Sequence, residues 1–462
     1  MNKHEIPRLV IAGTGSGVGK TTIVAGLLAV LKQRGLAVQS YKVGPDYIDP
    51  GYHRLASGKP AHNLDTWLVS AENLVELFAT TAKGCDVAII EGVMGLYDGG
   101  RGGISSTAAI AKQLAAPVIL VLDAKAAGES IAATALGFKA YDTEVNLAGV
   151  IVNRLGSSSH KAMVGEALER LSITVFGQLL RTEALMIKER HLGLTPVTES
   201  DAAQALGAMA WQVSRDVAVD KLLEAARSAP PLPISKKIAS PKEKSVRIGV
   251  AQDEAFSFYY PESLAVLETL GAELVPFSPL GDKALPVVDG LIFGGGFPEM
   301  FLPDLSANMV IKAAIGRAAQ RAMPIYAECG GLMYLARQIE SFDGQSFEMV
   351  GLVPAVCRMQ SRLQTVGYVE ATALKDNIFC QRGESLRGHE FHFSSMTVDA
   401  DADFNWAFEF RKLRTGAVYP GGYAAGSVLA SYLHLHFSGN QAAAARFIAK
   451  CKEFQRQREM IP

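Results

Sequence analysis

Apolar residues in the first half of the chain gather in short runs that alternate with segments of helical spacing. Runs that are apolar at nearly every position are typical of parallel strands covered on both faces, whereas half-exposed strands alternate apolar with polar residues. The pattern therefore predicts an α/β domain with a parallel sheet and crossover helices, whose ligands gather at the carboxyl ends of the strands. The predicted strands are 9–12, 37–43, 86–91, 117–123, 147–154 and 172–177.

The same alternation starts again in the second half, after a change of composition. Residues 225–246 are rich in proline and lysine, which favours a linker. Apolar runs then return at 246–251, 274–277, 290–297 and 322–331. We predict two domains, a P-loop parallel-sheet domain over 1–228 and a second α/β domain over 247–462, joined by a linker over 229–246.

Composition and charge narrow the class of protein. The chain has 462 residues and a formal net charge of −1, so no basic surface indicates binding to nucleic acid or to an anionic membrane. The five cysteines are scattered without metal-site or disulfide spacing. No apolar run reaches the length of a membrane span. We expect a cytoplasmic protein with reduced thiols.

A glycine-rich turn between the first strand and the first helix predicts a phosphate-binding loop. Backbone N–H groups in such a turn point at a polyphosphate, the helix N-terminus adds its dipole, and a lysine neutralises charge. The strict pattern would place its first glycine where this chain has Thr14, with Gly13 one residue early. The residues expected to bind ATP are Gly15, Ser16, Gly17, Val18, Gly19, Lys20, Thr21 and Thr22.

Four acidic residues follow predicted strands, where a phosphate site needs carboxylates for metal and for orienting the acceptor. Asp46 and Asp49 follow the second strand, Glu91 closes the third, and Asp98 lies in the glycine-rich loop after it. We predict that Thr21, Asp46 and Glu91 bind Mg²⁺. Asp49 and Asp98 also fit a turn-stabilising role, whereas an acid at the end of a buried strand is costly without a partner.

Cys329 is the candidate nucleophile of the second half. It lies between a predicted strand and a helix, with small residues around it that permit a sharp elbow. We expect the helix dipole to lower the pKa of its thiol. Gly295, in the loop 294–296, and Gly330 are expected to donate backbone N–H groups to a tetrahedral oxyanion.

A nucleophilic cysteine needs a base, and His434 is the candidate. Residues 431–437 alternate apolar and polar residues as a strand does, which would place His434 and His436 on one face, with His436 as an orienting neighbour. A metal site at this pair lacks a third ligand. His389 and His392 do not have zinc-protease spacing and also fit a structural role.

With these residues located, the chain resembles the cobyrinate a,c-diamide synthase family over nearly its whole length. The first half is similar to dethiobiotin synthetase, which shares the Gly-Thr entry and the Val-Gly-Lys-Thr exit of the loop. The second half is similar to triad-type class I glutamine amidotransferases, which implies a flavodoxin-like domain. The motifs that carry the resemblance are 13–22, 42–47, 91–99, 189–194, 256–261, 294–299, 327–331, 387–392 and 430–436.

The resemblance implies a two-site ligase that uses ATP, Mg²⁺ and L-glutamine. ATP phosphorylates the c and then the a carboxylate of cobyrinate or a related tetrapyrrole-derived macrocycle. Cys329 releases ammonia from glutamine with His434 as acid and base, and the ammonia displaces phosphate to form the amide.

The resemblance also suggests roles for single residues. It implies that Asp46 and Asp98 orient the substrate or act as catalytic acids, and that Glu91 serves the metal or the intermediate. Asn153 is expected near the nucleotide base, as is Arg154. The candidates for binding the macrocycle are Tyr47, Ile48, Arg190 and His191.

Several alternatives stay open at the level of sequence. Hydrogenobyrinate and nickel-sirohydrochlorin a,c-diamide synthases share the motifs, and a P-loop nucleotide-switch or partition-type protein is a candidate of a different class. His436 stands where triad amidotransferases have glutamate, so the third member of the triad is open. The oligomeric state is open too, and a homo-oligomer is compatible with the sequence.

Overall fold

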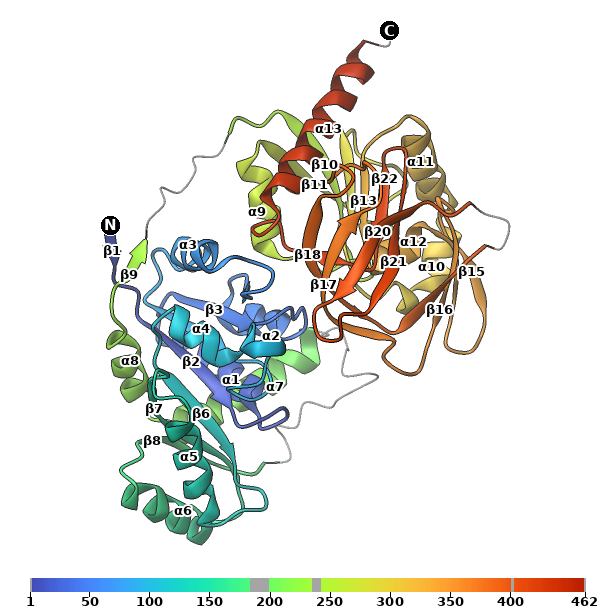
Figure 1. Ribbon diagram of the computed structural model, residues 1–462. Coiled ribbons are helices and arrows are strands. Elements are labelled where there is room, and N and C mark those ends of the chain that lie inside the picture. Colours follow the sequence, from blue (N-terminus) through green and yellow to red (C-terminus); the bar gives the residue numbers. More distant parts are fainter. Residues whose placement is uncertain (1, 183–198, 235–241, 400–402, 461–462) are drawn as a thin grey trace. The chain divides into compact units, whose positions relative to one another are not determined.

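The computed structural model describes residues 2–182, 199–234, 242–399 and 403–460 (Figure 1). The chain divides into two compact units, Met1–Ile238 and Ala239–Pro462, so the division falls inside the predicted linker 229–246. Part of that linker range forms strand β9 (Leu232–Ile234), which pairs antiparallel with β1 (Asn2–His4). No helix of the described residues is long and apolar enough to cross a membrane.

The first unit is built on a seven-stranded sheet in the order β4-β3-β5-β2-β6-β7-β8, and every neighbouring pair is parallel. The predicted parallel α/β sheet is confirmed here. The last strand begins three residues later than predicted, because Ser172 adopts a positive φ in a turn. The strands are β2 (Arg8–Gly13), β3 (Val38–Val43), β4 (His62–Leu64), β5 (Val87–Glu91), β6 (Val118–Asp123), β7 (Leu147–Leu155) and β8 (Val175–Leu180).

Helices connect strands of this sheet, because parallel neighbours can be joined only by crossover connections. The helix after the phosphate loop, α1, is buried along most of its length. It approaches α7 so closely that a Cβ at Gly26 would lie 2.7 Å from the Met209 carbonyl oxygen. The helices are α1 (Lys20–Gln33), α2 (Asp49–Ser57), α3 (Ala71–Thr81), η1 (Arg101–Gly103), α4 (Thr107–Gln113), α5 (Ser130–Tyr141), α6 (Ser158–Arg170), α7 (Glu199–Asp216) and α8 (Val219–Arg227).

The second unit has a ten-stranded mixed sheet in the order β11-β10-β12-β13-β22-β21-β20-β17-β18-β23. The first five strands are parallel, and the others are joined antiparallel. Four of the parallel strands lie in the predicted apolar runs, and β22 is the fifth. The strands are β10 (Val246–Ala251), β11 (Ala272–Phe277), β12 (Gly290–Phe293), β13 (Ile325–Glu328), β17 (Thr365–Ala373), β18 (Ser385–His392), β20 (Trp406–Lys412), β21 (Val418–Ala425), β22 (Val428–Ser431) and β23 (His434–Leu435).

A smaller sheet and several helices complete the described part of this unit. The sheet has the order β15-β14-β16-β19. Neighbouring residues of β12 enter different core clusters, Leu291 and Phe293 one and Ile292 the other, as the strand period of two requires. The remaining elements are β14 (Ala336–Glu340), β15 (Ser346–Glu348), β16 (Val353–Met359), β19 (Ser394–Val398), α9 (Pro261–Thr269), η3 (Pro298–Met300), α10 (Leu302–Ala307), α11 (Met309–Gln320), α12 (Gly330–Leu335) and α13 (Gln441–Glu459).

Candidate functional site

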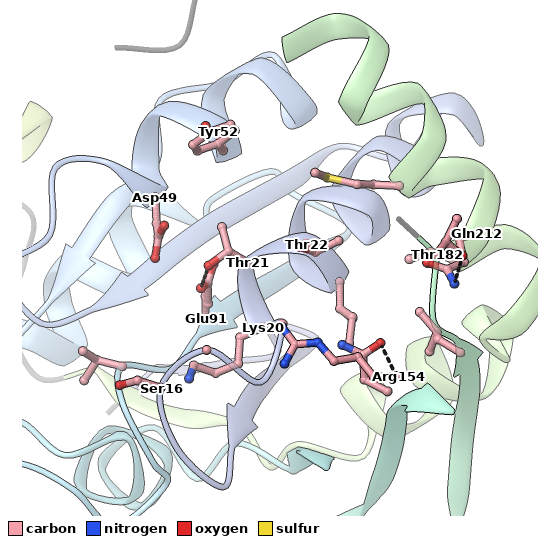
Figure 2. A pocket seen from close by; sticks show the side chains of 18 of the residues that line it. Ser16, Lys20, Thr21, Thr22, Asp49, Tyr52, Glu91, Arg154, Thr182 and Gln212 are labelled. Atoms are coloured by element: carbon pink, nitrogen blue, oxygen red, sulfur yellow. Dashed lines mark hydrogen bonds between the residues drawn. The ribbon is translucent and has the colours of Figure 1, made fainter. Parts of the chain in front are cut away.

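The glycine-rich turn of the first unit opens into a cavity of about 710 Å³. Gly17 and Gly19 have φ values of 73° and 96°, in the left-handed region that glycine adopts without strain. α1 begins at Lys20, so its N-terminal N–H groups face the cavity, as a phosphate site requires. The predicted ATP-binding residues that line the cavity are Ser16, Gly17, Gly19, Lys20, Thr21 and Thr22 (Figure 2).

The position of the first glycine has a packing reason. A Cβ at Gly13 would lie 2.7 Å from Val18 Cγ2 and 3.1 Å from Lys20 Nζ. Val18 is buried in the core, so its side chain anchors the loop while its neighbours face the cavity. The loop therefore needs a glycine at position 13, and Thr14 is tolerated.

Lys20 is held by the loop itself. Its Nζ donates to the Gly15 carbonyl oxygen at 2.9 Å and to the Met94 carbonyl oxygen at 2.6 Å. Burial, together with the nearby positive charge of Lys42, lowers the pKa of Lys20 to about 8. A polyphosphate bound beside Lys20 would place negative charge next to its ammonium group and so raise its pKa.

Glu91, the last residue of β5, is completely buried at the centre of a polar cluster. Thr21 Oγ1 donates to its Oε1 at 2.6 Å, and Lys42 Nζ donates to the same oxygen at 2.9 Å. His53 Nε2 lies 2.6 Å from its Oε2. Lys42 Nζ also lies 2.5 Å from Asp49 Oδ2 and 4.0 Å from Asp46 Oδ2.

These contacts determine which groups in the cluster are charged. Burial alone would raise the pKa of Glu91, but Lys42 and the hydrogen bond from His53 outweigh it, so the pKa is well below its usual range. Burial would likewise lower the pKa of Lys42, but Glu91, Asp49 and Asp46 raise it. Burial next to Glu91 and Asp46 raises the pKa of Asp49. The cluster therefore holds a Glu91–Lys42 ion pair.

The remaining residues predicted after β3 and β5 lie in two loops near the phosphate site. Asp46 and Ile48 line the cavity, and Asp46 Oδ1 accepts from the Ile48 and Asp49 N–H groups, at the start of α2. Tyr47 lies between them in the chain. Asp98 Oδ2 accepts from the Gly95 N–H at 2.9 Å, so this side chain stabilises its own loop.

The far end of the cavity is formed by the last residues of β7, the end of β8 with the two residues after it, and α7. Asn153 Nδ2 donates to the Val18 carbonyl oxygen at 2.9 Å, and Arg154 Nη1 lies 2.6 Å from Asp123 Oδ2. Figure 2 shows Arg154, Thr182 and Gln212 on the side away from Glu91 and Asp49. Arg190 and His191 lie outside the described residues.

In the second unit, Cys329 occupies a sharp turn between β13 and α12. Its φ is 47° and its ψ −102°, a strained conformation for a residue with a Cβ. Its N–H donates to the Ser431 carbonyl oxygen at 2.7 Å, and its carbonyl accepts from Met333. The expected strand-to-helix elbow is present, and such strain at a predicted nucleophile is consistent with a catalytic role.

The expected lowering of the thiol pKa is wrong. Burial raises the pKa of Cys329, and the carboxylates of Glu299 and Glu328 raise it further. The Gly330 N–H opposes this shift without reversing it, and α12 is only six residues long. The thiol therefore needs a base to lose its proton.

The two predicted oxyanion donors and the predicted base converge on this turn. A Cβ at Gly295 would lie 2.9 Å from His434 Cε1, and a Cβ at Gly330 would lie 3.2 Å from the Gly296 nitrogen. Both positions need glycine because the loop 294–296, the elbow and the His434 ring lie so close together. The arrangement fits acyl transfer from an amide.

The prediction of one strand over 431–437 is wrong. β22 ends at Ser431 and pairs with β13, whereas β23 holds only His434 and Leu435 and pairs with β18. Ser431 Oγ accepts from the Leu433 N–H at 3.0 Å and turns the chain between the two strands. His434 faces Glu328 and His436 faces Glu262, so the two histidines have different partners.

Sequence reasoning missed Lys42, His53 and Glu328 as site residues. One signal was available, since a buried acid that closes an apolar strand requires a partner. That rule implies a cation near Glu91, but it does not say which of the surrounding lysines and histidines the fold brings there. Within the described parts of the chain, no group of three or more His, Cys, Asp or Glu side chains is arranged to hold a metal ion.

Comparisons with known proteins match one family model to each of the two units. Residues 9–194 match the CobQ/CobB/MinD/ParA nucleotide binding domain, and residues 247–442 match the CobB/CobQ-like glutamine amidotransferase domain. The predicted P-loop domain followed by an amidotransferase domain is thereby confirmed.

Curated relatives match nearly the whole chain. It is 46% identical to the cobyrinate a,c-diamide synthase of Dehalococcoides mccartyi strain CBDB1, over 97% of this chain and 99% of that protein. It is 42% identical to the enzyme of the same name from Leptospira interrogans (strain Fiocruz L1-130), with the same coverage. It is 40% identical to the hydrogenobyrinate a,c-diamide synthase of Streptomyces coelicolor, over 97% of this chain and 98% of that protein.

Sequence similarity to amidating enzymes over nearly the whole chain argues against the nucleotide-switch alternative. The nucleotide-binding domain implies the use of ATP. The chain therefore belongs to the cobyrinate a,c-diamide synthase family and is an amidating ligase with a glutamine amidotransferase domain.

Proposed function

We propose that this ligase amidates the a and c carboxylates of cobyrinate through acyl-phosphate intermediates, with glutamine as the nitrogen source. The observation that carries the proposal is the pairing of two sites in one chain. One is a phosphate loop whose Thr21 contacts a buried anionic Glu91. The other is a strained Cys329 at an elbow that packs, as His434 does, against the loop 294–296. The names of the relatives support the choice of macrocycle.

The first unit would activate the carboxylate. ATP binds with its phosphates on the loop, where Lys20 and the N-terminus of α1 offset their charge. A carboxylate oxygen of the macrocycle attacks the γ-phosphorus, the bond to the bridging oxygen breaks, and ADP leaves. Asp46 and Asp98 orient the acceptor, Tyr47 and Ile48 contact it, and Asn153 lies near the nucleotide base. Arg190 and His191 remain candidates for binding the macrocycle.

The donor set near the loop fits Mg²⁺. Thr21 offers a hydroxyl oxygen and Glu91 and Asp46 offer carboxylate oxygens, the ligands that this ion prefers. Thr21 and Glu91 are already in contact, and Asp46 lines the same cavity. Bound there, Mg²⁺ would neutralise charge on the phosphates.

The second unit would supply ammonia. His434 takes the proton of the Cys329 thiol, and Sγ attacks the carboxamide carbon of glutamine while the Gly295 and Gly330 N–H groups bind the oxyanion. The protonated His434 returns the proton to the leaving nitrogen, and ammonia departs. Water then hydrolyses the glutamyl thioester. Ammonia attacks the acyl phosphate, and phosphate leaves as the amide forms.

Mass spectrometry of the products tests the acceptor. Purified protein is incubated with ATP, glutamine and cobyrinate, hydrogenobyrinate or nickel-sirohydrochlorin in parallel, and a product with two amides is expected from cobyrinate. Its absence there, with a two-amide product from another macrocycle, would replace the proposed substrate.

The nitrogen donor is tested separately. Cys329→Ala should lose amidation with glutamine and keep amidation with added ammonium, because the thioester cannot form while the phosphate site is unchanged. If the variant still released ammonia from glutamine, Cys329 would not be the nucleophile.

A further inference from the structure

A third side chain adjoins Cys329 and His434, and it comes from the residue directly before the nucleophile. Glu328 is the last residue of β13. Its Oε2 lies 3.5 Å from His434 Nδ1. The contact joins the strand that carries the nucleophile to β23, which carries the base.

The carboxylate of Glu328 is fixed from its other oxygen. Oε1 accepts from the Tyr326 hydroxyl and from the Leu435 N–H, the latter at 3.1 Å. Because both donors bind Oε1, the plane of the carboxylate is set and Oε2 is directed to the imidazole. Both side chains are nearly buried, with 11% of Glu328 and 3% of His434 exposed, so water screens this interaction little.

The His434 ring is held on its other sides as well. It stacks on the His389 ring, with centroids 4.8 Å apart and an interplanar angle of 14°. Its Cε1 packs against Gly295 in the predicted oxyanion loop. Nδ1 is turned to Glu328, so the proposed exchange of a proton with the thiol takes place at Nε2.

We propose that Glu328 is the positioning residue that completes the Cys329–His434 pair, in the role for which triad amidotransferases use a glutamate after the histidine. This inference rests on the proposed hydrolysis of glutamine at Cys329. Glu328 accepts a hydrogen bond from Nδ1–H, which leaves Nε2 unprotonated and able to take the thiol proton. It then stabilises the imidazolium that forms.

A distance of 3.5 Å is long for a hydrogen bond, but catalytic hydrogen bonds are often long in ligand-free sites and shorten when substrate binds. The contact also explains how the carboxylate of Glu328 can be tolerated beside the nucleophilic thiol of Cys329. Glu328 raises the pKa of Cys329, which costs thiolate before substrate arrives, and the same charge favours the ion pair of thiolate and imidazolium once the proton moves to His434.

His436 does not take this role. Its Nε2 lies 3.5 Å from Glu262 Oε1, and its ring packs on Tyr260 with centroids 4.8 Å apart. This second buried His–Glu pair has the same separation as the first, but its acid comes from α9 and pairs with His436. Glu262 is therefore a matched control for Glu328.

The test compares Glu328→Gln with Glu262→Gln in the full chain, using ammonia release from glutamine. A glutamine at 328 keeps an amide oxygen for Tyr326 and Leu435 but presents NH₂ to Nδ1, so it favours the wrong tautomer. We expect its kcat to fall by about 100-fold or more while KM for glutamine stays unchanged. Glu262→Gln should keep the wild-type kcat.

Two further readouts separate positioning from folding. Glu328→Asp keeps a charged acceptor and should recover part of the kcat that Glu328→Gln loses. Tyr326→Phe removes only a donor to Oε1 and should cost far less than Glu328→Gln. Equal losses in Glu328→Gln and Glu262→Gln, no loss in Glu328→Gln, or an aspartate no better than glutamine would overturn the inference.

Failure of the proposed function gives a different result. If wild-type protein released no ammonia from glutamine, or if Cys329→Ala released as much as wild type, the glutaminase reaction itself would be rejected. If wild type were active and dependent on Cys329 while Glu328→Gln stayed fully active, only the role of Glu328 would be rejected.

Discussion

Glu91 in the first unit and Glu328 in the second occupy the same kind of position. Each is the last residue of an inner parallel strand, each is buried, and each lies beside a histidine. Glu91 Oε2 is 2.6 Å from His53 Nε2, and Glu328 Oε2 is 3.5 Å from His434 Nδ1. Their remaining contacts differ.

Oε1 of Glu91 contacts a cation, whereas Oε1 of Glu328 accepts hydrogen bonds from neutral donors. Lys42 Nζ contacts Glu91 Oε1, and the resulting ion pair holds the pKa of Glu91 well below its usual range. Glu328 Oε1 accepts from a phenol and a backbone N–H, so its charge is left to act on His434. The comparison teaches that the neighbours of a strand-end acid decide whether it is a fixed anion or a partner for a proton carrier.

The largest expected effect comes from removing the charge of Glu91. Glu91→Gln leaves Lys42 buried with weaker compensation, and breaking a buried ion pair in this way costs about 3–5 kcal/mol of unfolding free energy. We expect the loss of ammonia-driven amidation together with a lower melting temperature.

The control for Glu91→Gln is ammonia release from glutamine, which belongs to the other unit and should persist. Amidation at the wild-type rate would show that Glu91 and Glu328 do not differ in the way proposed here.

A second prediction concerns the acids that would orient the acceptor. Asp46→Asn and Asp98→Asn should each reduce amidation by about 100-fold, in the range of one positioned catalytic group. Formation of the Cys329 thioester should continue, which trapping of the glutamyl enzyme would detect. A parallel loss of glutamine hydrolysis would instead indicate a folding defect.

The third prediction tests whether the two histidines differ in role. His53 is buried against Glu91 in the first unit, so His53→Gln should cost about 1–3 kcal/mol of stability through the lost hydrogen bond. Amidation should fall by less than in Glu91→Gln. His434→Gln should instead abolish glutamine hydrolysis. If the two variants had the same effect on ammonia release, the contrast between the sites would fail.

The smallest effect is a pH dependence of nucleotide binding. The pKa of Lys20 is lowered to about 8, so Lys20 is charged below that pH and neutral above it. ATP affinity should therefore decrease as pH rises through about 8, by at most about tenfold per pH unit. Titration calorimetry between pH 7 and 9 would measure it.

Lys20→Met is the control for this experiment. It should bind ATP weakly and lose most of the pH dependence. Any slope that remains would report Asp49. Burial raises the pKa of Asp49, so this residue also becomes negatively charged as the pH rises. An unchanged slope in Lys20→Met would assign the whole effect to groups other than Lys20.

Much of the parallel architecture could be predicted from apolar runs. β3, β5, β6, β7 and β10 lie where those runs are, because a strand covered on both faces is apolar at almost every position. The pairing of the antiparallel half of the second sheet was not predicted, since its strands are mixed in composition and their partners are far away in the chain. The strand predicted over 431–437 failed because Ser431 turns the chain by a local hydrogen bond.

The sequence by itself determined the phosphate loop, the strand-end acids and the nucleophile elbow, because each depends on local backbone chemistry that a short motif carries. Only the tertiary structure decided their partners. Lys42 and His53 reach Glu91, and Glu328 reaches His434, through strands and helices that meet across the fold. Burial makes such pairings necessary, but the choice among many lysines, histidines and acids is made by the register and packing of elements distant in sequence.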